Sequence, residues 1–302
     1  MERRGGASQG EALATWAMWA VVLAIIFVTY RRLPPDTRAA TNDLYHVSGN
    51  GLVGGLSRVL VELNFPLALV AIVVVLVAVD ALPRRAWAVA GPAIGLSAAV
   101  AWPGVIDQDD LDARVVNVIP ALGVALSLGL TAAASRRSGA GLARRLPFDP
   151  VRATIAAVLL LVSIPWIAAD LGVFLPDGVF IMRRVALDTD GLPIAAVHLG
   201  HHHGMDGTLV ALSAILLSRP RLRRGATASV TVAVTSLAFA YGIVNCVQDA
   251  WNEQLVKRGT LDQQIPSAIL PSLSWIWLVI LVLAALTALT LRRESRRVDS
   301  AA

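Results

Sequence analysis

Apolar residues in this chain are gathered into blocks of about twenty residues, and most charged residues lie between the blocks. A helix needs about 20 apolar residues to cross a hydrocarbon core of about 30 Å, so each block predicts a membrane-spanning helix. Seven blocks follow the pattern cleanly: Ala12–Tyr30, Leu63–Leu82, Ala86–Val105, Val115–Ala134, Thr154–Val173, Ala226–Val247 and Ile269–Leu291.

An eighth block is less regular. Thr208–Leu217 has only ten residues, and it reaches spanning length only when it is extended back to Leu192, through a run of histidines. Residues 192–217 are therefore either a full span or a partly re-entrant segment. The pattern predicts an all-α polytopic membrane bundle of about eight transmembrane helices, with residues 1–302 forming one integral membrane domain. A six- or seven-span arrangement is the alternative.

Composition supports this fold class and excludes others. The chain is 56% hydrophobic and 16% charged, which is more apolar than a soluble domain. Its net charge is +5, but the basic residues flank the apolar blocks, so we do not expect nucleic-acid binding. All basic residues except Lys257 are arginine, a bias typical of a GC-rich bacterial genome. The single cysteine, Cys246, excludes a disulfide within the chain.

The distribution of charge predicts the orientation of the bundle. With eight spans and a cytoplasmic N-terminus, 17 of the 26 basic residues fall on the inner side, whereas most acidic residues fall outside. Lysine and arginine prefer cytoplasmic loops. We therefore expect a multi-pass plasma-membrane protein with both termini in the cytoplasm.

The first outer segment, residues 31–62, leaves the membrane through Leu33-Pro34-Pro35 and carries His46. Apolar residues then recur at helical spacing from Leu52 to Leu63. This spacing predicts a short helix that lies on the membrane surface or caps the bundle.

The third outer segment, residues 174–207, has no obvious secondary structure and ends in a histidine cluster. Four of the five histidines of the chain, His198, His201, His202 and His203, lie within six positions, and Asp206 follows. If this run is helical, His198, His202 and Asp206 share one face at a spacing of four, which suits a zinc or iron(II) site. The glycines between them also permit a loop that wraps an ion.

Residues from other outer segments are candidates to complete this site. His46 is a candidate metal ligand, and a helix continued from Ala226–Val247 would place Tyr241, Asn245, Asp249 and Glu253 on one face. Asp249 and Glu253 are the candidate general bases. A polar stripe at the end of a span usually faces a cavity or another helix rather than lipid.

Two motifs give local resemblances. His198-Leu-Gly-His201-His202 resembles one histidine box of membrane fatty-acid desaturases, but that family needs more histidines, in several boxes, than the five present here. His198-x-x-x-His202 resembles one element of the membrane ceramidase and adiponectin-receptor-like hydrolases. Those proteins carry the element in their last span, so its placement here differs. Each resemblance covers one element, and no family is identified over the whole chain.

Three functions remain open from the sequence. The first is a metal-dependent membrane enzyme that acts on a lipid or lipid-linked substrate at the outer face, with zinc or iron as its cofactor. The second is a transporter that handles a metal ion or a proton-coupled solute. The third is a non-catalytic membrane subunit whose outer loops dock a partner. A further alternative is that the histidine cluster is an ordinary solvated loop without a special role.

Overall fold

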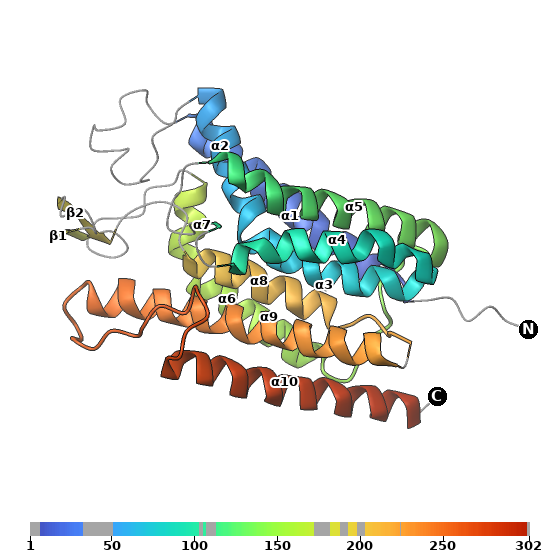
Figure 1. Ribbon diagram of the computed structural model, residues 1–302. Coiled ribbons are helices and arrows are strands. Elements are labelled where there is room, and N and C mark those ends of the chain that lie inside the picture. The colour runs from blue at the N-terminus through green and yellow to red at the C-terminus, as the bar shows by residue number, and fades with distance from the viewer. Residues whose placement is uncertain are drawn as a thin grey trace, which may run out of the picture.

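A computed structural model describes residues 7–32, 51–102, 105–106, 113–171, 182–187, 193–197, 203–223 and 225–300 (Figure 1). The elements in chain order are α1 (Gly10–Arg31), α2 (Gly51–Asn64), α3 (Pro66–Ala81), η1 (Arg84–Ala86), α4 (Trp87–Ala98), η2 (Ala99–Ala101), η3 (Val115–Asn117), α5 (Val118–Ser138), α6 (Asp149–Val162), α7 (Ile164–Asp170), β1 (Met182–Leu187), β2 (Pro193–Val197), α8 (His203–Leu217), α9 (Ala226–Trp251), the π-helical turn η4 (Asn252–Val256) and α10 (Trp275–Ser300). The predicted helical bundle is confirmed.

Residues 174–207, which the sequence predicted as an outer segment without obvious secondary structure, contain two strands and the start of a helix. Strands β1 and β2 pair antiparallel, with Val185 opposite Ala195, and α8 already begins at His203. The hairpin was missed because its strands are short, and a short apolar run gives little evidence of periodicity.

Helices α3 and α8 lie at the centre of the bundle. Fourteen of the sixteen residues of α3 are buried, and α8 is similarly enclosed. A helix that is apolar on every side cannot leave one face in water, so it is expected in a core or a membrane. Around this centre, α3 contacts α4, α5, α8 and α9, and α8 lies along α9.

Among the described residues, four helical segments are long and apolar enough to cross a membrane: Gly10–Arg31, Val115–Ser138, Ala226–Val256 and Trp275–Val298. The pair α2 and α3 makes a fifth if it is counted as one bent span. This is compatible with a multi-pass membrane protein. The count of eight spans stays a prediction, because the other expected blocks form shorter helices in the described part of the chain. The orientation of the bundle in the membrane also stays a prediction.

Several predicted span boundaries change in the structure. The block Leu63–Leu82 lies across a bend of 47° between α2 and α3, at the point where Pro66 begins α3. Thr154–Val173 is broken between α6 and α7, next to Pro165. Proline lacks a backbone N–H and cannot continue the helical hydrogen-bond ladder, which explains both interruptions. The last block, Ile269–Leu291, becomes helical only from Trp275.

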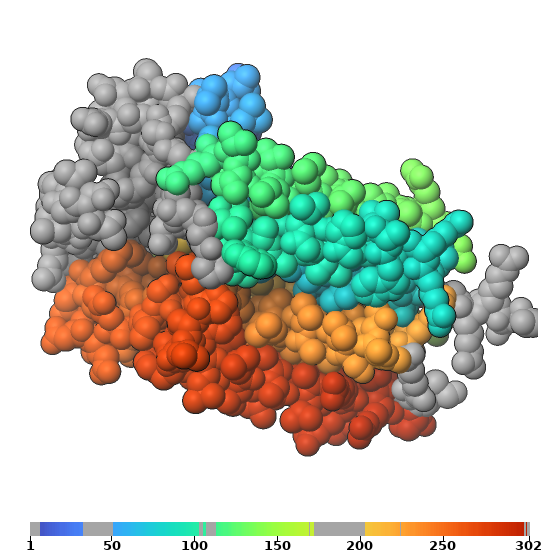
Figure 2. All heavy atoms as spheres, in the orientation of Figure 1, coloured from blue at the N-terminus to red at the C-terminus, as the bar shows by residue number. Residues whose placement is uncertain are grey.

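The periphery is apolar and exposed. Helix α10 lies along one side of the bundle beside α9, and α4 and α5 occupy another part of the same view (Figure 2). Many large apolar side chains of α10, such as Leu278 and Leu286, are exposed. The first residues of α1 and the last residues of α10 lie at the same end of the bundle (Figure 1). That end also carries most of the arginines, and we call it the arginine-rich end.

Candidate functional site

Four predicted site residues come together at the end opposite the arginine-rich end. His203 and Asp206 lie in the first turn of α8, Asp249 in the last turn of α9, and Glu253 in η4. The two helices are antiparallel neighbours, so the start of α8 meets the end of α9. The other predicted residues, His46, His198, His201 and His202, lie outside the described residues.

Glycines allow α8 and α9 to approach closely. A Cβ atom on Gly207 would lie 2.7 Å from the carbonyl oxygen of Gly242 on α9, which is too short for any side chain. A Cβ atom on Gly204 would collide with the ring of Trp166 and lie 2.7 Å from Oδ2 of Asp249. Small residues at both helix surfaces therefore set the distance between the two helices.

This close approach places Asp249 at the N-terminus of α8. Oδ2 of Asp249 accepts a hydrogen bond from the backbone N–H of Gly204 at 2.9 Å. A carboxylate is stabilised at this position by the free N–H groups and the positive end of the helix dipole. The bond therefore fixes one carboxylate oxygen and orients the group toward the start of α8.

His203 lies beside two carboxylates. Its Nδ1 atom is 3.9 Å from Oδ2 of Asp206, and His203 also interacts electrostatically with Asp249. The His203 ring is edge-on to Phe65, with ring centroids 6.3 Å apart. Phe65 is the residue at the bend between α2 and α3, so the bend contributes one wall of the site.

A buried ion pair on α2 adds charges that the sequence analysis did not assign to the site. Arg58 and Glu62 form a salt bridge of 2.8 Å, and their side chains are 2% and 1% exposed. Arg58 lies over the ring of Tyr30 at 5.5 Å, and it interacts electrostatically with Asp206 and Asp170. The spacing of four between opposite charges on an apolar helix was the sequence signal for this pair.

We call this group of charged side chains the α8–α9 cluster. Its members are Arg58, Glu62, Asp170, His203, Asp206, Asp249, Glu253 and Lys257.

The polar stripe predicted on α9 is confirmed as an inward-facing surface. Tyr241, Asn245 and Glu253 are buried, and Asp249 is partly buried. The hydroxyl of Tyr241 donates to the carbonyl of Ile269 at 3.0 Å. Glu253 is paired through one oxygen with Lys257, and its other oxygen, Oε2, has no hydrogen-bond partner among the described residues.

The depth of the cluster follows from helix geometry. At a rise of about 1.5 Å per residue, Asp249 lies about 35 Å along α9 from its first residue, Ala226. A hydrocarbon core is about 30 Å thick. If α9 enters the core near Ala226, the cluster lies at the opposite boundary between membrane and water.

A metal site is not assembled by the described residues alone. Among them, no group of three or more histidine, cysteine, aspartate or glutamate side chains is arranged to hold a metal ion. His203, Asp206 and Asp249 approach one another, but the remaining predicted ligands lie outside the described part of the chain. The metal hypothesis therefore depends on His46, His198, His201 and His202.

The arginine-rich end has a second set of ionic contacts, with a different character. Asp149 accepts hydrogen bonds from Arg219 at 3.1 and 3.0 Å, and Arg219 also contacts Glu11 at 3.2 Å. Arg152 donates to Ser218 at 3.0 Å and pairs with Glu294. These contacts join α1, α6, α10 and the connection after α8, so we interpret them as structural.

The electrostatics of this end agree with a structural role. Burial alone would raise the pKa of Asp149, but hydrogen bonds from Arg219 and from the Leu146 N–H outweigh it and hold the pKa below its ordinary value of 3.8. The hydrogen bond to Asp149 likewise raises the pKa of Arg219. Both groups are therefore stabilised in their charged forms.

Comparison of the chain with protein-family models, with curated proteins and with solved structures found no match.

Proposed function

We propose that this protein is a multi-pass membrane enzyme of the bacterial plasma membrane, with its site on the outer face, acting on a lipid or lipid-linked substrate. One observation carries the proposal. The start of α8 and the end of α9 bring His203, Asp206 and Asp249 together. With α9 entering the hydrocarbon core near Ala226, its length would put this group at the opposite membrane boundary. The boundary is where a group that does acid–base chemistry can reach a lipid headgroup and water at once.

The residues divide between two roles. His198, His201, His202, His203, Asp206 and His46 are the proposed ligands of a zinc or iron ion. A bound ion would lower the pKa of a water molecule and so supply a nucleophile near neutral pH. Asp249 is the first candidate for the general base, because the Gly204 N–H orients it beside His203. Glu253, whose Oε2 atom is buried, is the second candidate.

The outer-face assignment follows from charge. The end of the bundle opposite the cluster carries most of the arginines, among them Arg136 and Arg137 in the last turn of α5 and Arg297 in the last turn of α10. Arginine-rich connections remain on the cytoplasmic side. The α8–α9 cluster is therefore proposed to face the outside of the cell.

The first test is the metal content of purified, untagged protein, measured for the parent and for the double variant His198→Ala/His202→Ala. We expect about one equivalent of zinc, iron or copper in the parent and none in the double variant. The control is Asp262→Asn, an exposed acidic residue in the segment between η4 and α10, which should retain the ion. Absence of metal from the parent would refute the metal-dependent form of the proposal.

The second test is turnover. A bacterial polar lipid extract, dispersed in detergent with the parent, should give new products by mass spectrometry. Asp249→Asn should lower the rate of product formation by about 10²–10⁴-fold, and Asp262→Asn should leave it unchanged. If no product forms in detergent while sealed vesicles show protein-dependent ion movement, the enzyme proposal is wrong.

A transporter is the second candidate, and the broken helices favour it. α8 has 15 residues and begins within the polar cluster, α2 and α3 bend by 47° beside His203, and α6 breaks before α7. Discontinuous helices with N-termini at a polar site are typical of secondary transporters. Zinc or proton flux into proteoliposomes, lost in Asp249→Asn, would support this candidate.

A further inference from the structure

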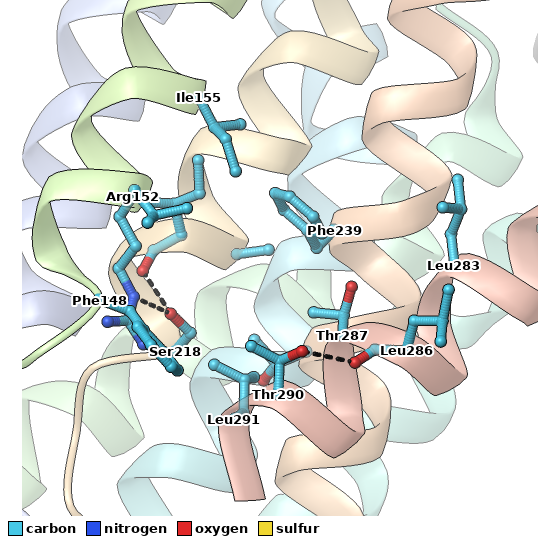
Figure 3. Close-up of a pocket in the computed structure, with 14 residues that line it drawn as sticks. Phe148, Arg152, Ile155, Ser218, Phe239, Leu283, Leu286, Thr287, Thr290 and Leu291 are labelled. Carbon is cyan, nitrogen blue, oxygen red and sulfur yellow. Dashed lines mark hydrogen bonds between the residues drawn. The ribbon is translucent and has the colours of Figure 1, made fainter. Parts of the chain in front are cut away.

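An apolar pocket of about 320 Å³ lies in the half of the bundle near the arginine-rich end (Figure 3). Ile155 of α6 and Leu283 of α10 lie on opposite sides of it, with Phe239 of α9 between them. Arg152 and Ser218 lie toward one end of the pocket, near Leu291. Its volume is in the range of ordinary ligand sites, and its lining is almost entirely hydrocarbon.

A smaller and more polar pocket adjoins it. This pocket measures about 180 Å³ and shares Ser218 and Leu291 with the apolar pocket. Arg219 and Arg221 line it, together with residues from the first turns of α9 and the last turns of α10. The Arg219 side chain is paired with Asp149 and Glu11, whereas the exposed Arg221 side chain has no ionic partner in the described part of the chain. Glu294 also lines the smaller pocket, and its carboxylate is paired with Arg152. The two pockets together therefore have an apolar section and a polar end at which Arg221 is the cation without an ionic partner among the described residues.

Thr235 adds a second, independent observation to the apolar pocket. This residue of α9 lines the apolar pocket, is 2% exposed, and its hydroxyl has no hydrogen-bond partner among the described residues. Other helical threonines, such as Thr231 and Thr290, donate to the carbonyl four residues earlier. A buried hydroxyl without a partner is costly, so a ligand that accepts its hydrogen bond would gain affinity.

The order of these groups along α9 matches an amphiphile. Ala228 and Val232 line the smaller, polar pocket, and Thr235 follows about one turn further into the bundle, in the apolar pocket. A glycerophospholipid carries its groups in the same order: a charged headgroup, ester carbonyls and an acyl chain. A free anion would leave the apolar pocket empty, and a free hydrocarbon would leave Arg221 and Thr235 without contacts.

We propose that these joined pockets bind one glycerophospholipid with a net negative headgroup. One of its two acyl chains occupies the apolar pocket, the ester carbonyl of that chain accepts a hydrogen bond from Thr235, and the headgroup phosphate contacts Arg221. This site is at the opposite end from the α8–α9 cluster and does not depend on the function proposed for that cluster.

The test is binding of defined lipids to delipidated, detergent-solubilised protein, followed by native mass spectrometry. Phosphatidylglycerol, phosphatidylcholine and inorganic phosphate are added separately. We expect one phosphatidylglycerol per chain, bound about fivefold more tightly than phosphatidylcholine, as for one arginine near an anionic lipid. Inorganic phosphate alone should not bind measurably.

Matched variants locate the binding. Thr287→Trp, which fills the apolar pocket from α10, should abolish lipid binding, whereas Ala285→Trp on the exposed side of the same helix should not. Arg221→Gln should remove the preference for phosphatidylglycerol, whereas Arg136→Gln, an exposed arginine on α5, should retain it. Thr235→Val should weaken the binding of both phosphatidylglycerol and phosphatidylcholine.

Three results would overturn the proposal. They are equal binding of the two lipids by the parent, parent-like binding by a folded Thr287→Trp variant, or phosphate binding as tight as lipid binding. If Thr287→Trp does not fold, Thr235→Val and Arg221→Gln decide the question, and parent-like binding by both would refute it.

Discussion

Arg152 and Glu294, which are 142 residues apart in the chain, form a two-pronged ion pair. Nη1 of Arg152 donates to Oε1 of Glu294 at 3.0 Å, and Nη2 donates to Oε2 at 2.6 Å. The two side chains are 10% and 5% exposed, so the pair is largely shielded from water. It holds the beginning of α6 against the last turns of α10, a helix that otherwise packs mainly on α9.

Breaking this pair from one side should destabilise the fold strongly. Arg152→Met leaves the Glu294 carboxylate buried without its cation, and we expect a loss of about 3–5 kcal/mol in the free energy of unfolding. The double variant Arg152→Met/Glu294→Leu removes both charges and should recover most of that loss. Thermal unfolding in detergent, followed by tryptophan fluorescence, measures all three. Equal losses in the single and double variants would contradict this account.

Asp149 should make the stability of the arginine-rich end depend on pH. Its pKa in the folded protein is lowered below 3.8, mainly because the hydrogen bonds from Arg219 and Leu146 outweigh the effect of burial. A carboxyl with a lowered folded pKa stabilises the fold above its unfolded pKa, and that contribution disappears as the pH falls through the folded value.

We therefore expect the unfolding temperature of the parent to fall as the pH decreases below about 4, relative to Asp149→Asn. The amide introduced by this substitution cannot ionise, so the variant should be less stable than the parent at pH 7. Its unfolding temperature should also fall less than that of the parent when the pH is lowered. Unfolding temperatures measured from pH 7 to pH 3 give the comparison. If the two proteins had parallel pH profiles, Asp149 would not contribute to the pH dependence of stability.

The glycine contact between α8 and α9 should tolerate no side chain. Gly207→Ala places a methyl group 2.7 Å from the Gly242 carbonyl oxygen, and overpacking of this kind costs about 1–3 kcal/mol. Gly95 and Gly129 are matched controls, because a Cβ atom at either of these helical positions meets nothing within 4 Å. Gly95→Ala and Gly129→Ala should be neutral or slightly stabilising in thermal unfolding. A neutral Gly207→Ala would show that the helices can separate at little cost.

The sequence predicted those features of the site that depend on local periodicity. Tyr241, Asn245, Asp249 and Glu253 recur every four residues, and that spacing fixes one face of a helix whatever surrounds it. The stripe faces inward as predicted. The helical bundle was equally predictable, because long apolar blocks have few other stable forms.

Features that depend on distant partners were not predictable in the same way. Arg58 belongs to the cluster because the bend at Phe65 turns α2 relative to α3, and the neighbours of Arg58, such as Asp206, lie far away in the chain. The pairing of Arg152 with Glu294 likewise depends on where α10 packs. A single sequence records the charges but not which of them meet.

Asp249 has two separable roles, one in the fold and one in the proposed chemistry. Asp249→Asn retains an oxygen that can accept the Gly204 N–H but removes the charge and the basicity. Asp249→Ala removes the acceptor as well and leaves that N–H without its partner, at a cost of about 1–3 kcal/mol. We expect Asp249→Asn to unfold near the parent temperature and Asp249→Ala to unfold well below it.

Turnover of the lipid extract should separate these roles. If Asp249 is the general base, both variants should lose activity by about 10²–10⁴-fold, including the stable Asp249→Asn. Glu253→Gln is the comparison, because Glu253 lies one turn further along and is paired with Lys257. A stable Asp249→Asn variant with full activity would assign Asp249 to the fold alone. Loss of activity in Glu253→Gln but not in Asp249→Asn would transfer the role of base to Glu253.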